Sequence, residues 1–300
     1  MTQATVTRRR LLQISAAVPL AGLSAQAAAA APAAHWQGVA LGAPAQIVLA
    51  GMTQDEAGPV FAMVRDEIAR LEAIFSLYQT GSALSKLNAA GRLTQPPPEL
   101  LEVLSLSAAV WSASEGAFDP SIQRLWQARA MGVPDPKVQG GFGDLRLAAD
   151  EIVLRPRTAL TLNGIAQGYI TDRVAAVLRG QGLRDLVVDA GEQRALGMRP
   201  GDGGWRIGIA APTGAVLAQV SLRDRALATS SPEGTVLPDG QGHILDPRTG
   251  RSTARWGTVS VLHDSAAVAD ALSTAACCLN AQDTQMMLRH FDGAALAYRG

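Results

Sequence analysis

Several residue types are scarce in this 300-residue chain, and each scarcity excludes a class of protein. The only two cysteines are adjacent, Cys277 and Cys278, so the sequence offers neither a disulfide framework nor a cysteine metal site. Basic and acidic residues both number 26, and this neutrality argues against a nucleic-acid-binding protein, which usually carries a basic excess. No strongly apolar run reaches the roughly 18 residues of a spanning helix, so we expect no membrane insertion of the mature chain.

Common catalytic signatures are absent as well. The sequence contains no GxxxxGK[ST] phosphate loop, no HExxH zinc motif and no GxSxG nucleophile motif. What is present is apolar material: 48% of the residues are hydrophobic and 17% are charged, which is enough to build a core and too little charge for a disordered chain. We therefore expect a folded domain, with the two cysteines as small buried residues.

The neutral total conceals an uneven distribution of charge along the chain. Residues 1–34 contain Arg8, Arg9 and Arg10 but no acidic residue, and the rest of the chain has 23 basic and 26 acidic residues, a formal charge of −3. Paired arginines, a short apolar centre and an alanine-rich end are typical of a secretory signal of the twin-arginine type. The sequence therefore predicts a cleaved signal over residues 1–34 and a periplasmic protein formed by residues 35–300.

Hydrophobic periodicity predicts a mixture of helices and strands in residues 35–300. Apolar residues recur at helical spacing over 55–78, 99–114, 165–179 and 266–279. Strands are expected at 45–49, 159–163, 186–188, 205–209, 216–222 and 258–262, whereas 129–150 is expected to be a loop. Because several strands follow one another, the pattern favours an α+β fold over a doubly wound sheet.

Four polar clusters are candidates for chemistry, and one of them is Gly116-Ala117-Phe118-Asp119-Pro120. His243 precedes a turn that explains Asp246, Pro247 and Gly250 but not the histidine, although an isolated histidine is often structural. Asp270 and Thr274 are four residues apart on a helix and could share a hard cation such as Mg²⁺, or could equally be an exposed acid and a hydroxyl bonded to its own helix. Glycines in 163–169 stand where a strand is expected to enter a helix, a junction that can bind an anion.

Six segments, taken together and in order, resemble the FAD:protein FMN transferases of the ApbE family, and the resemblance covers nearly all of residues 35–300. They are SALSKLN at 82–88, GAFDP at 116–120, GIAQGY at 164–169, ATS at 228–230, HILDPRTG at 243–250 and ADALST at 269–274. The resemblance implies a single ApbE-like, T-fold-related domain with a mainly antiparallel sheet and flanking helices. It also implies a Mg²⁺-dependent enzyme that splits FAD, attaches FMN through its phosphate to a Thr or Ser of a membrane redox protein, and releases AMP.

The resemblance also assigns roles to individual residues. His243 corresponds to the proposed general base. The metal ligands would be Asp270, Thr274 and the backbone carbonyl of Gly164. Contacts to the flavin nucleotide fall on Gln37, Tyr78, Ala117, Phe118, Asp119, Thr161, Gln167, and Ile244 or Leu245.

This chain departs from the family at positions that bear on nucleotide binding. Relatives usually have Asp at Thr161, Lys or Glu at Gln167, and two glycines and an acid at Gly191-Glu192-Gln193. The serine-glycine that follows Ala228-Thr229 in relatives is here Ser230-Ser231. Two alternatives therefore stay open beside the transferase: a periplasmic FAD pyrophosphatase that yields FMN and AMP, and a flavin-binding assembly factor without catalysis.

Overall fold

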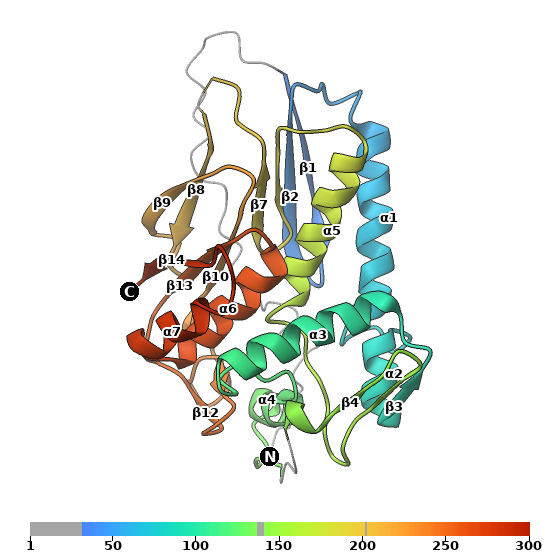
Figure 1. The fold of residues 1–300 in the computed structure, drawn as a ribbon, viewed down its shortest axis with the longest axis vertical. Coiled ribbons are helices and arrows are strands. Elements are labelled where there is room, and N and C mark those ends of the chain that lie inside the picture. Colours follow the sequence, from blue (N-terminus) through green and yellow to red (C-terminus); the bar gives the residue numbers. More distant parts are fainter. Residues whose placement is uncertain (1–31, 137–140, 202) are drawn as a thin grey trace, which may run out of the picture.

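The computed structural model describes residues 32–136, 141–201 and 203–300. A seven-stranded sheet runs through the molecule in the order β1-β2-β6-β7-β10-β13-β14, and every neighbouring pair is antiparallel. Its strands are β1 (Ala33–Ala40), β2 (Ala43–Ala50), β6 (Leu186–Asp189), β7 (Gln193–Leu196), β10 (Ala226–Ser230), β13 (Val259–His263) and β14 (Ala295–Arg299). The mixed, mainly antiparallel fold expected from the sequence is confirmed, with helices along one side of the sheet (Figure 1).

Seven helices and several short strands complete the described part. The helices are α1 (Gly58–Phe75), α2 (Ala83–Ala90), α3 (Pro98–Ala113), α4 (Gln123–Met131), α5 (Ala166–Gly180), α6 (Ala266–Cys278) and α7 (Ala281–Leu288), with 3-10 turns η2 (Phe142–Asp144) and η3 (Pro232–Gly234). A three-stranded sheet joins β3 (Arg92–Thr94), β5 (Glu151–Val153) and β4 (Arg146–Leu147). Two hairpins consist of β8 (Trp205–Ala210) with β9 (Val216–Leu222), and of β11 (Leu245–Asp246) with β12 (Arg251–Ser252). Among these residues, no helix has the length and hydropathy needed to cross a bilayer.

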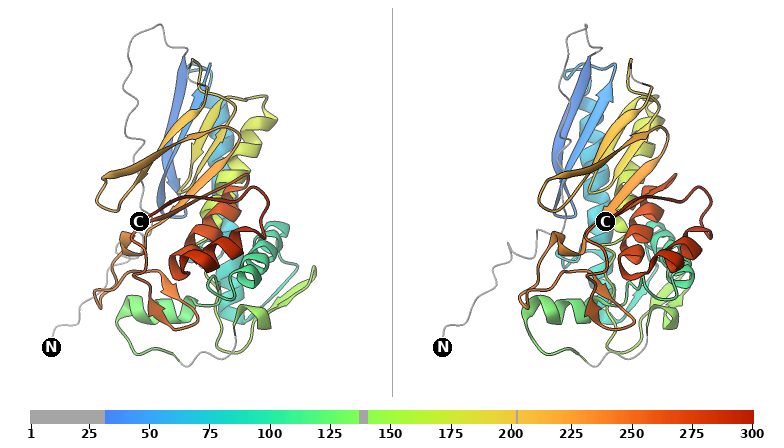
Figure 2. Two further views of the ribbon diagram at one scale, coloured as in Figure 1. Left: turned by 60° about the vertical axis from the view of Figure 1, so that its left-hand side comes forward. Right: turned by 90° about the vertical axis from the view of Figure 1, so that its left-hand side faces the viewer.

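Both faces of the main sheet are covered, and alternation along the strands explains how. On β2, Ile47 and Leu49 pack in the large core with α1 and α5, whereas Val48 lies in a second cluster with the β8–β9 hairpin. Val187 on β6 also belongs to that second cluster. Successive side chains of a strand point to opposite faces, so a continuous apolar run buries both sides. Figure 2 shows the hairpin crossing the side of the sheet opposite the helices.

Helices α5 and α6 pack closely because α5 carries a glycine at their contact. A Cβ on Gly168 would lie 2.3 Å from the carbonyl oxygen of Ala266, so only glycine permits this approach. Asp172, one turn further along α5, accepts hydrogen bonds from the backbone amides of Ala266 and Ala267 at 2.9 and 3.1 Å. Its carboxylate therefore caps the positive N-terminus of α6 and fixes the two helices relative to each other.

Most predicted elements are confirmed, but the expected strand at 159–163 is wrong. This segment is extended, yet its backbone bonds go elsewhere: Asn88 accepts from Leu160 N and donates to Leu160 O, and Thr161 N donates to Pro120 O. Only an isolated bridge links Ala159 to Ile122. The predicted loop at 129–150 contains the end of α4, the turn η2 and the two-residue strand β4.

The N-terminal prediction falls mainly outside the described residues, which begin at 32. Ala33 and Ala34, the last two residues of the expected signal, already belong to β1, where they pair with Ala50 and Leu49. Cys277 and Cys278 are buried and unbonded, as expected.

Candidate active site

A cavity lies where the segments before α5, after α3 and after η3 meet helix α6. Phe118 and Asp119 follow α3, Thr161 and Gly164 precede α5, and Ser230 ends β10. The structure brings together nearly all the residues assigned from the sequence, and those that line the cavity are Ala117, Phe118, Asp119, Thr161, Gly164, Gln167, His243, Ile244, Leu245, Asp270 and Thr274.

His243 presents one defined ring nitrogen for chemistry. Its Nδ1 lies 3.0 Å from the carbonyl oxygen of Pro232, which can only accept a hydrogen bond, so Nδ1 carries the proton. Nε2 of the neutral ring is therefore the basic atom. Burial lowers the pKa of His243 below 6.5, against the raising effect of the Pro232 and Thr235 carbonyls. The ring is thus neutral at pH 7 and able to accept a proton.

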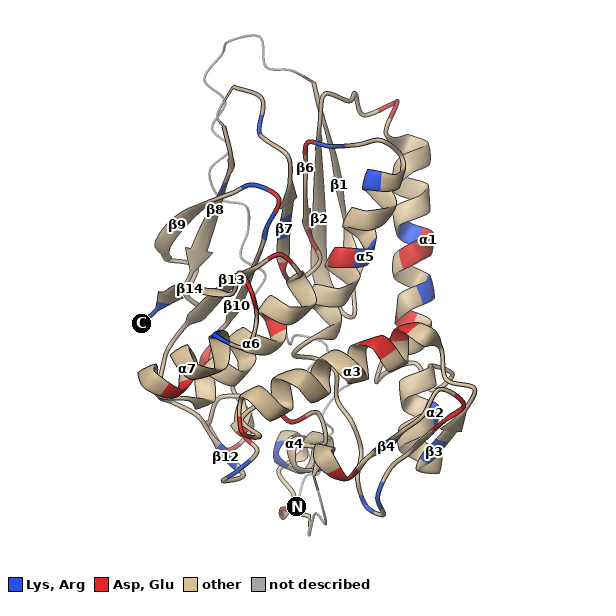
Figure 3. Cartoon of the chain, in the orientation of Figure 1, with Lys and Arg blue, Asp and Glu red and all other residues tan. Residues whose placement is uncertain are grey.

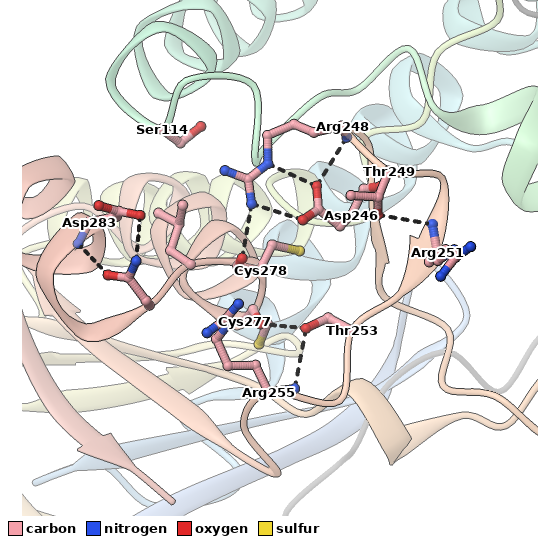
Figure 4. Close-up of polar contacts among 12 residues, drawn as sticks. Ser114, Asp246, Arg248, Thr249, Arg251, Thr253, Arg255, Cys277, Cys278 and Asp283 are labelled. Atoms are coloured by element: carbon pink, nitrogen blue, oxygen red, sulfur yellow. Dashed lines mark hydrogen bonds and ion pairs between the residues drawn. The ribbon is translucent and has the colours of Figure 1, made fainter.

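The loop that carries His243 is fastened to the C-terminal end of α6 (Figure 4). Arg248 donates to the carbonyl oxygen of Cys278 at 3.0 Å and pairs with Asp246 at 2.8 Å, and Thr253 Oγ1 donates to the carbonyl oxygen of Cys277 at 2.8 Å. These donors satisfy carbonyls that a helix end leaves unpaired. The HILDPRTG segment therefore holds the histidine loop against the helix that bears Asp270 and Thr274.

Asp270 and Thr274 both line the cavity, so the alternative of an exposed acid and a threonine hydroxyl bonded to its own helix is wrong for Asp270, and the Thr274 hydroxyl faces Ser230 instead. Asp270 is 3% exposed, and its Oδ2 accepts from the amide of Gly168 at 3.2 Å. The Thr274 hydroxyl lies 3.3 Å from Ser230 Oγ. A Cβ on Gly164 would lie 2.9 Å from Thr274 Oγ1, so the glycine lets the chain pass directly beside this hydroxyl. The glycines Gly164 and Gly168 thus permit close packing against α6. The expected anion contact at this junction is made within the protein, because the Gly168 amide binds the Asp270 carboxylate.

Glu192 is a further site residue, to which the sequence assigns no role beyond a departure from the family pattern. It lines the cavity, is 5% exposed, and its Oε2 accepts from the amide of Thr229 at 3.0 Å. Burial raises the pKa of Glu192 well above its usual value, and the charges of Asp270 and Asp189 raise it further. Burial likewise raises the pKa of Asp270. The feature that marks Glu192 as a site residue is that its carboxylate shares a buried space with that of Asp270. Because the two residues are 78 positions apart, the sequence does not indicate that they meet.

The donor set of this cavity suits a hard cation. Among the described residues, no group of three or more His, Cys, Asp or Glu side chains is arranged to hold a metal, so a metal here would also need hydroxyl, carbonyl or water ligands. Asp270, Thr274 and the backbone at Gly164 supply oxygen donors of that kind, which Mg²⁺ prefers. In the part of the chain that the structure describes, no Lys or Arg lines the cavity, so no described cationic side chain lies beside the buried carboxylates there. Elsewhere, basic and acidic residues are interspersed through the fold (Figure 3).

Two nucleotide-contact predictions fall outside the cavity. Gln37 is exposed on β1, and Tyr78 follows α1 with 44% of its surface exposed; neither lines the cavity. Their contacts to flavin stay predictions. Asp119 lines the cavity, but both of its oxygens already bind locally: Oδ1 accepts from Ser121 N at 2.7 Å, and Oδ2 accepts from Phe142 N at 3.3 Å.

The fold and the cavity together define the class of protein. It has an antiparallel sheet with helices on one side, and a cavity beside α6 that is lined by oxygen atoms and by the basic histidine His243. Residues 41–297 match the model of the ApbE family. The chain belongs to the ApbE family.

Individual relatives and solved structures agree with this placement. The chain is 31% identical to a FAD:protein FMN transferase of Treponema pallidum, over 78% of this chain and 74% of that protein. It is 24% identical to one of Klebsiella pneumoniae, over 93% and 89%, and 27% identical to one of Rhodobacter capsulatus, of which it spans only 56%. The flavin transferase ApbE of Vibrio cholerae has the same fold, with a TM-score of 0.74, 23% identity, and coverage of 88% of this chain and 92% of that one.

Proposed function

We propose that this protein is a Mg²⁺-dependent FAD:protein FMN transferase. The observation that carries the proposal is the meeting of a neutral histidine, with Nε2 unprotonated, and a buried oxygen donor set in one cavity. Curated relatives that span most of the chain carry this activity in their names. The acceptor is a Thr or Ser hydroxyl of a redox protein.

The reaction exchanges the phosphoanhydride bond of FAD for a phosphoester bond to the acceptor. The acceptor hydroxyl oxygen forms a bond to the FMN phosphorus, the bond from that phosphorus to the bridging oxygen breaks, and AMP leaves with that oxygen. His243 Nε2 takes the hydroxyl proton, which a base with a pKa below neutral can do without first losing a proton of its own. Pro232 holds the ring through Nδ1, so the base is oriented before the substrate arrives.

Asp270, Thr274 and the Gly164 carbonyl would hold the Mg²⁺, which when bound neutralises charge on the pyrophosphate. The pyrophosphate needs this neutralisation, because the described lining residues include carboxylates but no Lys or Arg. The enclosed space, about 150 Å³, is smaller than the roughly 300–1,000 Å³ of a typical ligand pocket. We infer that the pyrophosphate occupies this space and that the ring systems of FAD extend beyond it.

The deciding experiment incubates purified protein with FAD, Mg²⁺ and candidate acceptor domains encoded near its gene. Transfer gives a fluorescent, covalently labelled acceptor band, and AMP appears in equal amount. Rapid FMN and AMP formation without any acceptor would instead identify a pyrophosphatase. If His243→Ala and Asp270→Ala leave every FAD-dependent activity unchanged, the protein is a flavin-binding assembly factor.

We further propose that the protein works in the periplasm after export by the twin-arginine signal in residues 1–34. Replacing Arg8, Arg9 and Arg10 with lysine should retain the protein in the cytoplasm. Fractionation of cells that express the two forms tests this, with a periplasmic marker enzyme as the control.

A further inference from the structure

We infer that Glu192 supplies a second carboxylate to the cation site of this protein, beside Asp270, Thr274 and the Gly164 carbonyl. The inference rests on the proposed function, because it concerns the metal that the function requires. It goes further by adding a ligand that the family resemblance does not assign, at a position where that resemblance implies glycine.

The first supporting observation is the position of the side chain. Glu192 follows the end of β6 and lines the same cavity as Asp270 and Thr274. Thr171 Oγ1 on α5 donates to the carbonyl oxygen of Glu192 at 3.0 Å, which fixes this residue against α5. The amide of Thr229 then binds Oε2 at 3.0 Å, so both the backbone and the carboxylate are held.

The second observation is that one oxygen of the Glu192 carboxylate has no hydrogen-bond donor among the described residues. Oε1 of Glu192 accepts no hydrogen bond from any described residue, although the side chain is 95% buried. Asp270 is in the same condition, because only its Oδ2 accepts, from Gly168. Each buried carboxylate therefore retains one oxygen without a hydrogen-bond donor among the described residues, and both carboxylates line the same cavity.

The third observation is that the usual cationic partners of a buried carboxylate are absent among the described residues of the cavity. Buried carboxylates are normally paired with a cation or strongly hydrogen-bonded. Among the described residues that line the cavity there is no Lys or Arg, and the one histidine, His243, already donates its Nδ1–H to the Pro232 carbonyl, while burial lowers its pKa. A divalent cation satisfies both free oxygens at once, and carboxylate oxygens are the donors that it prefers.

Asp189 provides a matched control. It is 7% exposed at the end of the same strand, and its charge also acts on Glu192. Both of its oxygens are already paired, Oδ1 with the amide of Gly191 and Oδ2 with Gln193 Nε2, each at 3.1 Å, and it does not line the cavity. Asp189→Asn therefore removes a nearby charge without removing a ligand.

The test measures Mg²⁺ binding by isothermal titration calorimetry, in the absence of FAD, for the wild type, Glu192→Gln and Asp189→Asn. We expect Glu192→Gln to weaken Mg²⁺ binding by at least roughly tenfold, the lower range for losses of groups around bound metals. Asp189→Asn should change it by less than about threefold, because a charge without ligation acts through screened electrostatics. A second measurement, water-proton relaxation by bound Mn²⁺, should report one more exchangeable water in Glu192→Gln.

Three outcomes would overturn the inference: unchanged Mg²⁺ affinity in Glu192→Gln, equal weakening by Asp189→Asn, or an unchanged number of waters on Mn²⁺. If Glu192→Gln does not fold, Glu192→Gly restores the residue of the relatives and carries the same expectation. A wild type that binds no Mg²⁺ contradicts the metal requirement itself. A wild type that binds it with unchanged affinity in the variants contradicts only the role of Glu192.

Discussion

Gly168→Ala tests whether the contact between α5 and α6 is what places Asp270. The added Cβ would lie 2.3 Å from Ala266 O, 2.5 Å from Ala266 C and 2.7 Å from Ala267 N, all of which are backbone atoms. A carbon normally approaches a carbonyl oxygen no closer than about 3.3 Å, so the helices must separate by roughly 1 Å. Because no flexible side chain can move aside, the strain falls on the helix packing.

The expected cost follows from two opposing effects. Overpacking a tight contact costs about 1–3 kcal/mol, and replacing a helical glycine with alanine returns up to about 1 kcal/mol. We expect a net loss near 1–2 kcal/mol in the free energy of unfolding. At about 2–4 °C per kcal/mol for domains of this size, the melting temperature should fall by roughly 2–8 °C. Mg²⁺ affinity should fall too, because Gly168 N binds Asp270.

Thermal unfolding followed by circular dichroism measures the effect, with Gly180→Ala as the control. Gly180 ends the same helix, and a Cβ there would meet nothing within 4 Å. This control should be neutral or slightly stabilising. The reasoning is refuted if Gly168→Ala is as stable as Gly180→Ala, or if it loses stability while Mg²⁺ binding remains at the wild-type level.

Other predictions concern the chemistry of the cavity. His243→Gln should lower the rate of transfer by roughly 10²–10⁴ while FAD affinity, measured by flavin fluorescence, stays within about threefold; an unaffected rate would contradict the base role. Because burial lowers the pKa of His243, the wild-type rate should be flat above pH 6.5 and fall on acidification below it, and this acid limb should vanish in His243→Gln. Gly164→Ala places a Cβ 2.9 Å from Thr274 Oγ1, 3.2 Å from Thr274 Cγ2 and 3.3 Å from Phe118, so calorimetry should find weaker Mg²⁺ binding together with a lower melting temperature.

Elements with strong local patterns could be predicted from the sequence. Helices α1 and α6 have apolar residues at helical spacing, and β9 has the same bounds, Val216–Leu222, that its residues indicated. The segment 159–163 has the same kind of pattern but is no strand, because Asn88, 72 positions from Leu160, takes its hydrogen bonds. The contact with Asn88 determines the conformation of this segment, and hydrophobic periodicity carries no information about contacts with distant residues.

The site was predicted where one motif holds the chemistry and was missed where distant segments meet. His243, Asp270 and Thr274 lie in short motifs, and the structure places all three in one cavity. The sequence marks Glu192 only as a departure from the family pattern. Its closeness to Asp270 cannot be predicted locally, because it depends on the pairing of β6 and β7 and on the packing of α6. Gln37 and Tyr78 were assigned by resemblance alone, and neither lines that cavity.

The two walls of the cavity are not equally rigid. Twelve of the thirteen residues of α6 are buried, and the exception, Thr274, opens onto the cavity. Amides in such a helix exchange with solvent only when the whole domain unfolds, whereas short turns such as η3, beside the His243 loop, can open locally. A ligand therefore meets an α6 wall whose shape is already set, and any ordering entropy lost on binding comes from the turns around η3 rather than from α6 or from the His243 ring, which Pro232 already orients.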